Sequence, residues 1–188
     1  MQHSIDDIRN ITLHGKVALS AVTIERVAPV VKDRKVRDLI GKLTRDLWKW
    51  QLLKKQAGAA LSEDEAMKLP SCVLYRKYTD ELLFIPEDAR ENSVVRSANV
   101  LHGFVCWMID GMERMLNPEK PFVLGADILD ASYSWLVEGM RLATLAAPQP
   151  ETEYRWQRQA IDKLMKFHAV KEDDYHGAPL IADFFDDL

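Results

Sequence analysis

Apolar residues spaced alternately four and three apart restrict the possible folds of this chain more than any other feature. The longest such series ends just before Asn117 and Pro118 and consists of Val94, Ala98, Leu101, Val105, Met108, Met112 and Met115. An α-helix makes one turn in about 3.6 residues, so all these positions lie on one face of a helix. The segment is therefore predicted to be a long amphipathic helix that buries this face in a core.

Four other segments repeat apolar residues in the same way between residues that end helices. They cover residues 13–27, 36–57, 128–146 and 156–167, with Pro29, Gly58, Pro148 and Pro150 at their boundaries. A capping box of Ser4 and Asp7 is expected to open the first helix, and Asp33 can cap the second. Because only a short link joins these two helices, they are expected to form an antiparallel hairpin.

The region between the second and the longest helix is less regular. Residues 62–69 begin with a capping box and are predicted to form a short helix. Residues 72–85 fit either a helix or a two-stranded hairpin, and the helix is favoured because no strong two-residue turn signal is present. The chain is thus predicted to be an all-α, single-domain bundle of about five long helices plus one or two short ones, with any minor strand content at residues 72–85.

The last eighteen residues, Lys171 to Leu188, differ from the rest of the chain in composition. They hold six acidic residues and one lysine, whereas the preceding residues are nearly neutral, and acids alternate with aromatic residues from Asp183 to Asp187. We therefore divide the chain into a helical bundle domain, residues 1–170, and an acidic-aromatic tail, residues 171–188. Three states of the tail are open: a frayed terminus, a segment packed on its own bundle, or part of a partner interface.

Composition argues against several classes of protein. The acidic isoelectric point of about 5.8 disfavours general nucleic-acid binding, which depends on neutralising phosphates. No apolar run approaches the roughly 20 residues that span a bilayer, and residues 1–10 do not resemble a signal peptide. The two cysteines do not make a disulfide framework, which fits a reducing compartment. A cytoplasmic protein without membrane or nucleic-acid contacts and without a cofactor is expected.

One helix face carries residues with catalytic potential. His102, Cys106 and Asp110 stand four residues apart in the predicted long helix, which aligns a base, a thiol and a carboxylate. A nucleophilic cysteine needs a lowered pKa, and a mid-helix position does not supply one. A small core cysteine beside a hydrogen-bonded histidine is therefore favoured over an enzyme that uses this face.

Metal and apolar-ligand sites are the remaining small-molecule possibilities. Helical di-metal sites use Glu-x-x-His pairs, and none occurs in this chain, so no metal is expected. The methionines at positions 108, 112 and 115 could line an adaptable groove, but they continue a core pattern without interruption. A bundle that binds a small apolar ligand, or a regulator, stays open as an alternative function.

Trp48 is the one candidate contact outside the tail. It points about 160° away from Trp50 around the helix and is flanked by Arg45, Lys49 and Lys55. Either the helix is buried over a broad front, or Trp48 marks a basic-aromatic surface patch. Such a patch could also be where the acidic tail docks.

The favoured hypothesis is a non-enzymatic, cytosolic, monomeric or dimeric protein that occludes a basic protein partner, as an immunity protein or antitoxin does. Complementary charge would raise the association rate, and apolar anchors would slow dissociation. The expected partner-binding residues are Asp173, Asp174, Asp183, Phe184, Phe185, Asp186, Asp187 and Trp48. No catalytic residue is assigned under this hypothesis.

Overall fold

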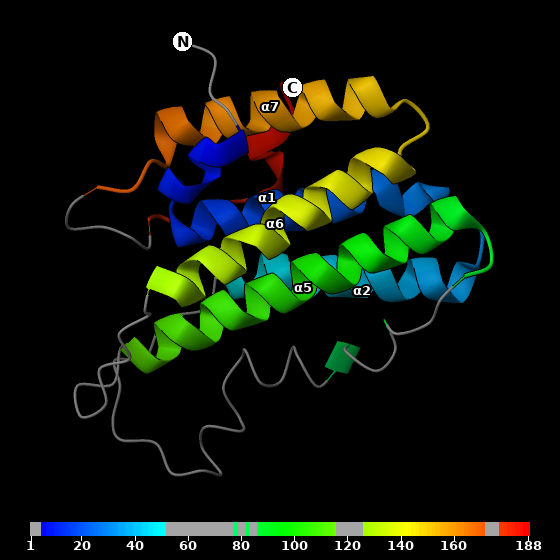
Figure 1. Ribbon diagram of the computed structural model, residues 1–188, viewed down its shortest axis with the longest axis horizontal. Helices are drawn as coiled ribbons and strands as arrows, with labels where there is room; N and C mark the ends of the chain where they lie inside the picture. Colours follow the sequence, from blue (N-terminus) through cyan, green and yellow to red (C-terminus); the bar gives the residue numbers. More distant parts are fainter. Residues whose placement is uncertain (1–4, 52–76, 79–81, 83–85, 116–125, 172–176) are drawn as a thin grey trace.

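The computed structural model describes residues 5–51, 77–78, 82, 86–115, 126–171 and 177–188. These residues form an all-α bundle of five α-helices, as predicted from the apolar spacing. The only extended pairing among them is an isolated antiparallel bridge between Ile11 and Ala169. In Figure 1, α7 runs along one edge of the bundle, α2 and α5 along the opposite edge, and α1 and α6 between them.

Helix α1 (Leu13–Val27) is the centre of the bundle. It packs against α2, α5, α6 and α7, and every residue from Leu13 to Ala21 is buried. A helix that contacts neighbours on all sides loses the polar face that a surface helix shows. The burial of α1 therefore explains why its polar side chains His14, Lys16, Ser20 and Thr23 are buried together with its apolar ones.

Helices α1 and α2 (Arg34–Gln51) form the predicted antiparallel hairpin. A short 3₁₀ helix, η2 (Ala28–Val30), makes the link, and Asp33 Oδ1 accepts from the backbone N–H groups of Lys35 and Val36 at 2.8 and 3.3 Å. These bonds satisfy two of the free donors at the start of α2. The cap assigned to Asp33 from sequence is thus confirmed.

The start of α1 differs from the prediction. The chain forms a 3₁₀ helix, η1 (Ile5–Asn10), and α1 begins only at Leu13, with Thr12 as its N-cap. The reason is a contact with the far end of the chain: Thr12 N donates to His168 O at 2.8 Å, and Val170 N donates to Asn10 O at 2.7 Å. Pairing with residues 168–170 holds residues 10–12 in an extended form, which a continuous helix from Ser4 would not allow.

Helices α5 (Ala89–Met115) and α6 (Ala126–Ala146) pack more extensively on each other than any other pair. Their close approach depends on Gly139, where an added Cβ would lie 2.5 Å from the side chain of Leu101. Ser97 Oγ donates to Gly139 O across the same contact at 2.7 Å. The small residues of α6 therefore serve the close packing that the sequence indicates.

Helix α7 (Pro150–Phe167) follows a turn that begins beside Pro148, as expected. The buried residues Trp156, Ala160 and Leu164 face the bundle, in agreement with their spacing. Residues 62–69 lie outside the described residues. Of residues 72–85, Lys77, Tyr78 and Leu82 alone are described, so the choice between helix and hairpin stays a prediction.

Candidate partner-binding surfaces

The C-terminal residues 177–188 pack on helices α7 and α2, and the backbone N–H of the buried Leu180 donates to Gln51 Oε1 of α2 at 3.3 Å. They contain a short 3₁₀ helix, η4 (Ala182–Phe185), whose Phe185 is only 5% exposed and lies against Trp156, with ring centroids 5.9 Å apart. Phe184 is half-buried and makes edge contacts with Phe167 and His168. Of the three states expected for the tail, these residues adopt packing on their own bundle.

Lys163 of α7 also holds this segment, through polar contacts. Its Nζ donates both to the carbonyl oxygen of Phe184 and to a carboxylate oxygen of Asp187. The hydrogen bond from Lys163 favours the charged carboxylate, so the pKa of Asp187 lies below its usual value. Apolar packing and an ion pair therefore hold the same few residues.

The predicted partner-binding residues of the tail divide into two groups. Asp183, Asp186 and Asp187 have exposed side chains, whereas Phe184 and Phe185 contact α7. The two phenylalanines, expected to be anchors for a partner, thus anchor the segment to its own bundle. Asp173 and Asp174 lie outside the described residues.

Trp48 is partly buried, between the two alternatives that the sequence left open, a buried helix face and an exposed surface patch. The ring is half-buried at the edge of the core, and its Nε1 donates to Glu25 Oε1 of α1 at 3.0 Å. Partial burial raises the pKa of Glu25, and hydrogen bonds from Trp48 and Thr44 oppose this shift. The predicted docking of the tail at Trp48 is wrong for residues 177–188. Helix α7 offers these residues both an apolar contact at Trp156 and a cationic contact at Lys163.

A shallow groove of about 290 Å³ lies beside Trp48, between the end of α1 and the outer side of α2. The residues that line it are Glu25, Ala28, Pro29, Arg37, Gly41, Thr44 and Arg45. The groove could not be predicted from the sequence, because its lining residues come from α2 and from the end of the preceding helix. The signal within α2 was present, since Arg37, Gly41 and Arg45 follow one another at intervals of four on one helix face.

The candidate catalytic face has a different character. Cys106 Sγ lies 3.3 Å from His102 Nε2, and both side chains are buried. The ring of Tyr78 meets His102 edge-on at 5.8 Å, and its hydroxyl donates to Asp46 Oδ2 at 2.6 Å. The side chain of Asp110 lies outside the described residues, so the predicted third member stays untested.

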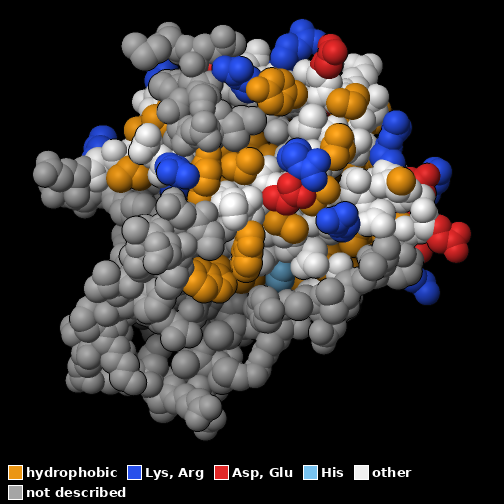
Figure 2. Space-filling view, in the orientation of Figure 1, with side chains coloured by type: hydrophobic (Ala, Val, Ile, Leu, Met, Phe, Trp, Pro, Cys, Tyr) orange, Lys and Arg blue, Asp and Glu red, His pale blue; other side chains and the backbone are white. Residues whose placement is uncertain are grey.

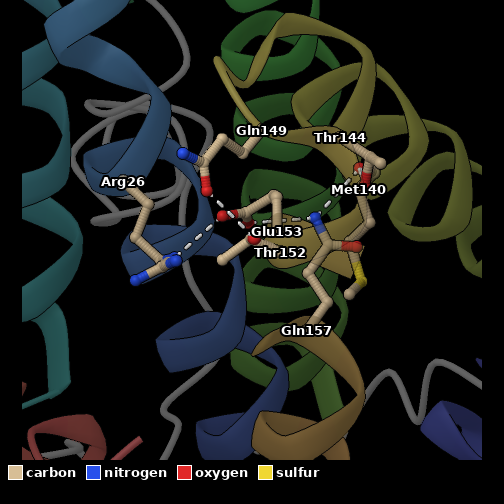
Figure 3. Close-up of polar contacts among 7 residues, drawn as sticks. All are labelled: Arg26, Met140, Thr144, Gln149, Thr152, Glu153 and Gln157. Carbon is tan, nitrogen blue, oxygen red and sulfur yellow. Dashed lines mark hydrogen bonds and ion pairs between the residues drawn. The ribbon is translucent and has the colours of Figure 1, made fainter. Parts of the chain in front are cut away.

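An ion pair between the exposed Arg26 and the buried Glu153 joins α1 to α7. Arg26 Nε donates to Glu153 Oε2 at 2.9 Å, and Gln157 Nε2 donates both to Glu153 Oε1 and to the backbone carbonyl of Met140 in α6 (Figure 3). The Arg26 guanidinium also lies 4.0 Å from the ring centroid of Trp156, whose ring contacts Phe185 as well. This cluster connects three helices and supports the indole on which the C-terminal segment rests.

The face formed by α5 and α6 mixes apolar and charged side chains (Figure 2). Two tryptophans, Trp107 of α5 and Trp135 of α6, are 41% and 44% exposed, and a Cβ on Gly103 would lie 3.8 Å from Trp135. Glu138 and Arg141 pair with each other on α6 at 2.7 Å. The described residues of this face therefore form neither a basic nor an acidic patch.

Comparisons with known proteins found no matching family model, no matching curated protein and no matching solved structure. Among the described residues, no group of histidine, cysteine and acidic side chains is arranged to hold a metal ion. Within the same residues, no helix has the length and apolar character needed to cross a membrane.

Proposed function

We propose that the protein is a non-catalytic, cytosolic binding protein that occludes a basic surface of a protein partner, in the manner of an immunity protein or antitoxin. The observation that carries this proposal is the orientation of the C-terminal segment. Its phenylalanines point to α7, the side chains of Asp183 and Asp186 are exposed to solvent, and the exposed carboxylate of Asp187 pairs with Lys163. Asp173, Asp174 and Trp48 belong to the proposed contact set as well.

Anchoring of the segment favours such a role on energetic grounds. A flexible acidic tail loses conformational entropy when it binds, whereas a segment already held by Phe185 and Lys163 loses much less. Carboxylates fixed on one side of the molecule also attract a basic partner before contact and raise the association rate. The monomer or dimer is the proposed binding unit.

An enzyme that uses His102 and Cys106 is the less favoured hypothesis. The two side chains are within hydrogen-bonding distance, but they are buried, and neither lines the groove described above. A thiol that reacts with substrate must be reachable. We therefore assign this pair to the core of the bundle in the proposal.

The test compares two variants of equal charge. Asp183→Asn with Asp186→Asn removes two outward carboxylates without touching Phe185 or Lys163, and Glu87→Gln with Glu151→Gln removes two exposed carboxylates elsewhere. Proteins captured from native lysate by the wild type are then produced pure, and their association kinetics with the wild type and with both variants are measured over a range of salt concentrations.

For a true partner, the tail variant slows association roughly 10-fold at low salt and flattens the salt dependence, while the control variant changes the rate less than about threefold. Equal behaviour of the two variants would remove the tail from the mechanism. A partner that is acidic, or one that binds unchanged after both substitutions in the tail, would contradict the proposal.

A further inference from the structure

The outer side of helix α2 is the most basic surface among the described residues. Every lysine and arginine from Lys32 to Lys49 has an exposed side chain. Three of them pair with acids, in the contacts Lys32–Glu91, Arg34–Asp38 and Lys49–Asp46. No ion pair within the described part of the chain involves Lys35, Arg37, Lys42 or Arg45.

Two of these cations without an ion pair, Arg37 and Arg45, line the groove beside Trp48. Gly41 lies between them and has no side chain to fill the groove. A Cβ added at this position would lie 3.6 Å from Arg45 Nη1. Ala28 and Pro29 give the opposite wall an apolar surface. The groove therefore joins an apolar wall to two guanidinium groups, which bind carboxylates through paired hydrogen bonds better than lysine does.

We propose that this groove binds a short, extended, acidic segment of a partner protein, with one carboxylate at Arg37 and a second at Arg45. The inference rests on α2 and the end of α1, and it does not depend on the C-terminal segment or on the proposed function. Charge complementarity decides the class of occupant, because the groove carries two guanidinium groups against the single carboxylate of Glu25, and neither arginine forms an ion pair within the described residues.

The spacing of the two arginines defines the segment. They are eight residues apart on one helix face, a separation of about 12 Å along the axis. In an extended peptide, residues i and i+4 point to the same side and lie about 13 Å apart. A segment of the form Asp-x-Leu-x-Asp therefore reaches both arginines and turns its central apolar side chain to Ala28 and Pro29.

The carboxylate of Glu25 distinguishes a peptide from a nucleic acid. It lines the groove and accepts a hydrogen bond from Trp48 Nε1, and a carboxylate has further lone pairs that a peptide N–H can use. A phosphate backbone has no comparable donor. The acidic residues Asp38 and Asp46 within α2 also interrupt the basic row that a phosphate backbone would need.

The probe for the test is a fluorescein-labelled peptide, acetyl-Gly-Asp-Ser-Leu-Ser-Asp-Gly-amide, and binding to the full chain is followed by fluorescence anisotropy. Arg37→Glu with Arg45→Glu reverses the two groove cations. Lys35→Glu with Lys42→Glu makes the same change in net charge on exposed positions of the same helix outside the groove. Circular dichroism and thermal unfolding establish that each variant is folded.

We expect the groove variant to weaken peptide binding roughly 10-fold or more at physiological salt, because charge-assisted hydrogen bonds are lost. The lysine variant should weaken it less than about threefold, since exposed charges are screened. Gly41→Leu keeps every charge, fills the groove and should also weaken binding about 10-fold. A peptide with both aspartates replaced by asparagine should bind the wild-type protein no more tightly than the original peptide binds the groove variant.

Four results would overturn the proposal. These are no measurable binding of the probe, equal losses in the arginine and lysine variants, unchanged binding by Gly41→Leu, and displacement of the peptide by a single-stranded oligonucleotide at lower concentration than by unlabelled peptide. Salt-sensitive self-association in sedimentation velocity, abolished by the arginine variant, would assign the groove to a second copy of the chain instead.

Discussion

Truncation of Phe185 to alanine tests how firmly the C-terminal segment is attached. The side chain is 5% exposed and lies on Trp156, so its removal withdraws most of a phenylalanine from the core. Burial of such a side chain contributes about 1.5–3 kcal/mol, and a cavity in a closed core would add to the loss. Residues 177–188 can instead lift away from α7, which limits the loss, and we expect about 2–3 kcal/mol.

The loss is measured by urea unfolding followed by tryptophan fluorescence, and hydrogen exchange of residues 182–188 reports the segment directly. For a chain of 188 residues the change corresponds to a fall in Tm of about 5–10 °C. Ile181→Ala is the matched control, because its side chain belongs to the same segment but is 57% exposed. The control should change stability by less than about 0.5 kcal/mol.

The reasoning fails if Phe185→Ala unfolds at the same urea concentration as the wild type, or if Ile181→Ala is equally destabilising. Unchanged exchange of residues 182–188 in the Phe185 variant would show that Lys163 and Phe184 hold the segment without Phe185. Faster exchange confined to these residues, with α7 still protected, is the expected pattern.

Three further predictions concern the bundle itself. Gly139→Ala should destabilise by about 1–3 kcal/mol in thermal unfolding, because the new Cβ would lie 2.5 Å from the fully buried Leu101, whereas Gly103→Ala, with 3.8 Å of room, should be neutral or stabilising by up to about 1 kcal/mol. Burial lowers the pKa of Lys16 from 10.5 to about 8, so between these pH values the unfolded chain holds a proton that the native protein lacks. Stability should therefore rise by up to about 3 kcal/mol as pH increases through this window, and urea unfolding of Lys16→Met should lack the rise. Cys106 is 4% exposed, and a thiol reagent should label it at neutral pH only at the rate of unfolding; rapid labelling of the native protein would contradict this assignment.

The helices could be predicted because apolar spacing and terminating residues act over short distances. The series from Val94 to Met108 and the cap at Asp33 agree with the structure for this reason. The beginning of α1 could not be found in the same way. It depends on hydrogen bonds from Thr12 and Val170 across more than half the chain, and nothing near Ser4 and Asp7 signals them.

The candidate surfaces show the same division between local and distant information. Composition revealed the acidic and aromatic residues of the tail, but the partner of Phe185 is Trp156, and no local pattern connects the two. The groove beside Trp48 likewise needs Glu25 from α1 and Pro29 from η2 opposite Arg37 and Arg45 of α2. Sequence patterns place residues on one face of one helix, and a surface made by two helices becomes visible only when their packing is known.

The backbone contacts between residues 10–12 and 168–170 have a consequence for synthesis of the chain. Helix α1 is made before α7, yet the residues that fix its start and the helix that covers one of its sides are made much later. At roughly 5–20 residues per second, about ten seconds or more pass before residue 170 is available. During that time α2, α5 and α6 can already cover most of α1, but the side that faces α7 stays open, so this side is expected to be the last part of the core to close.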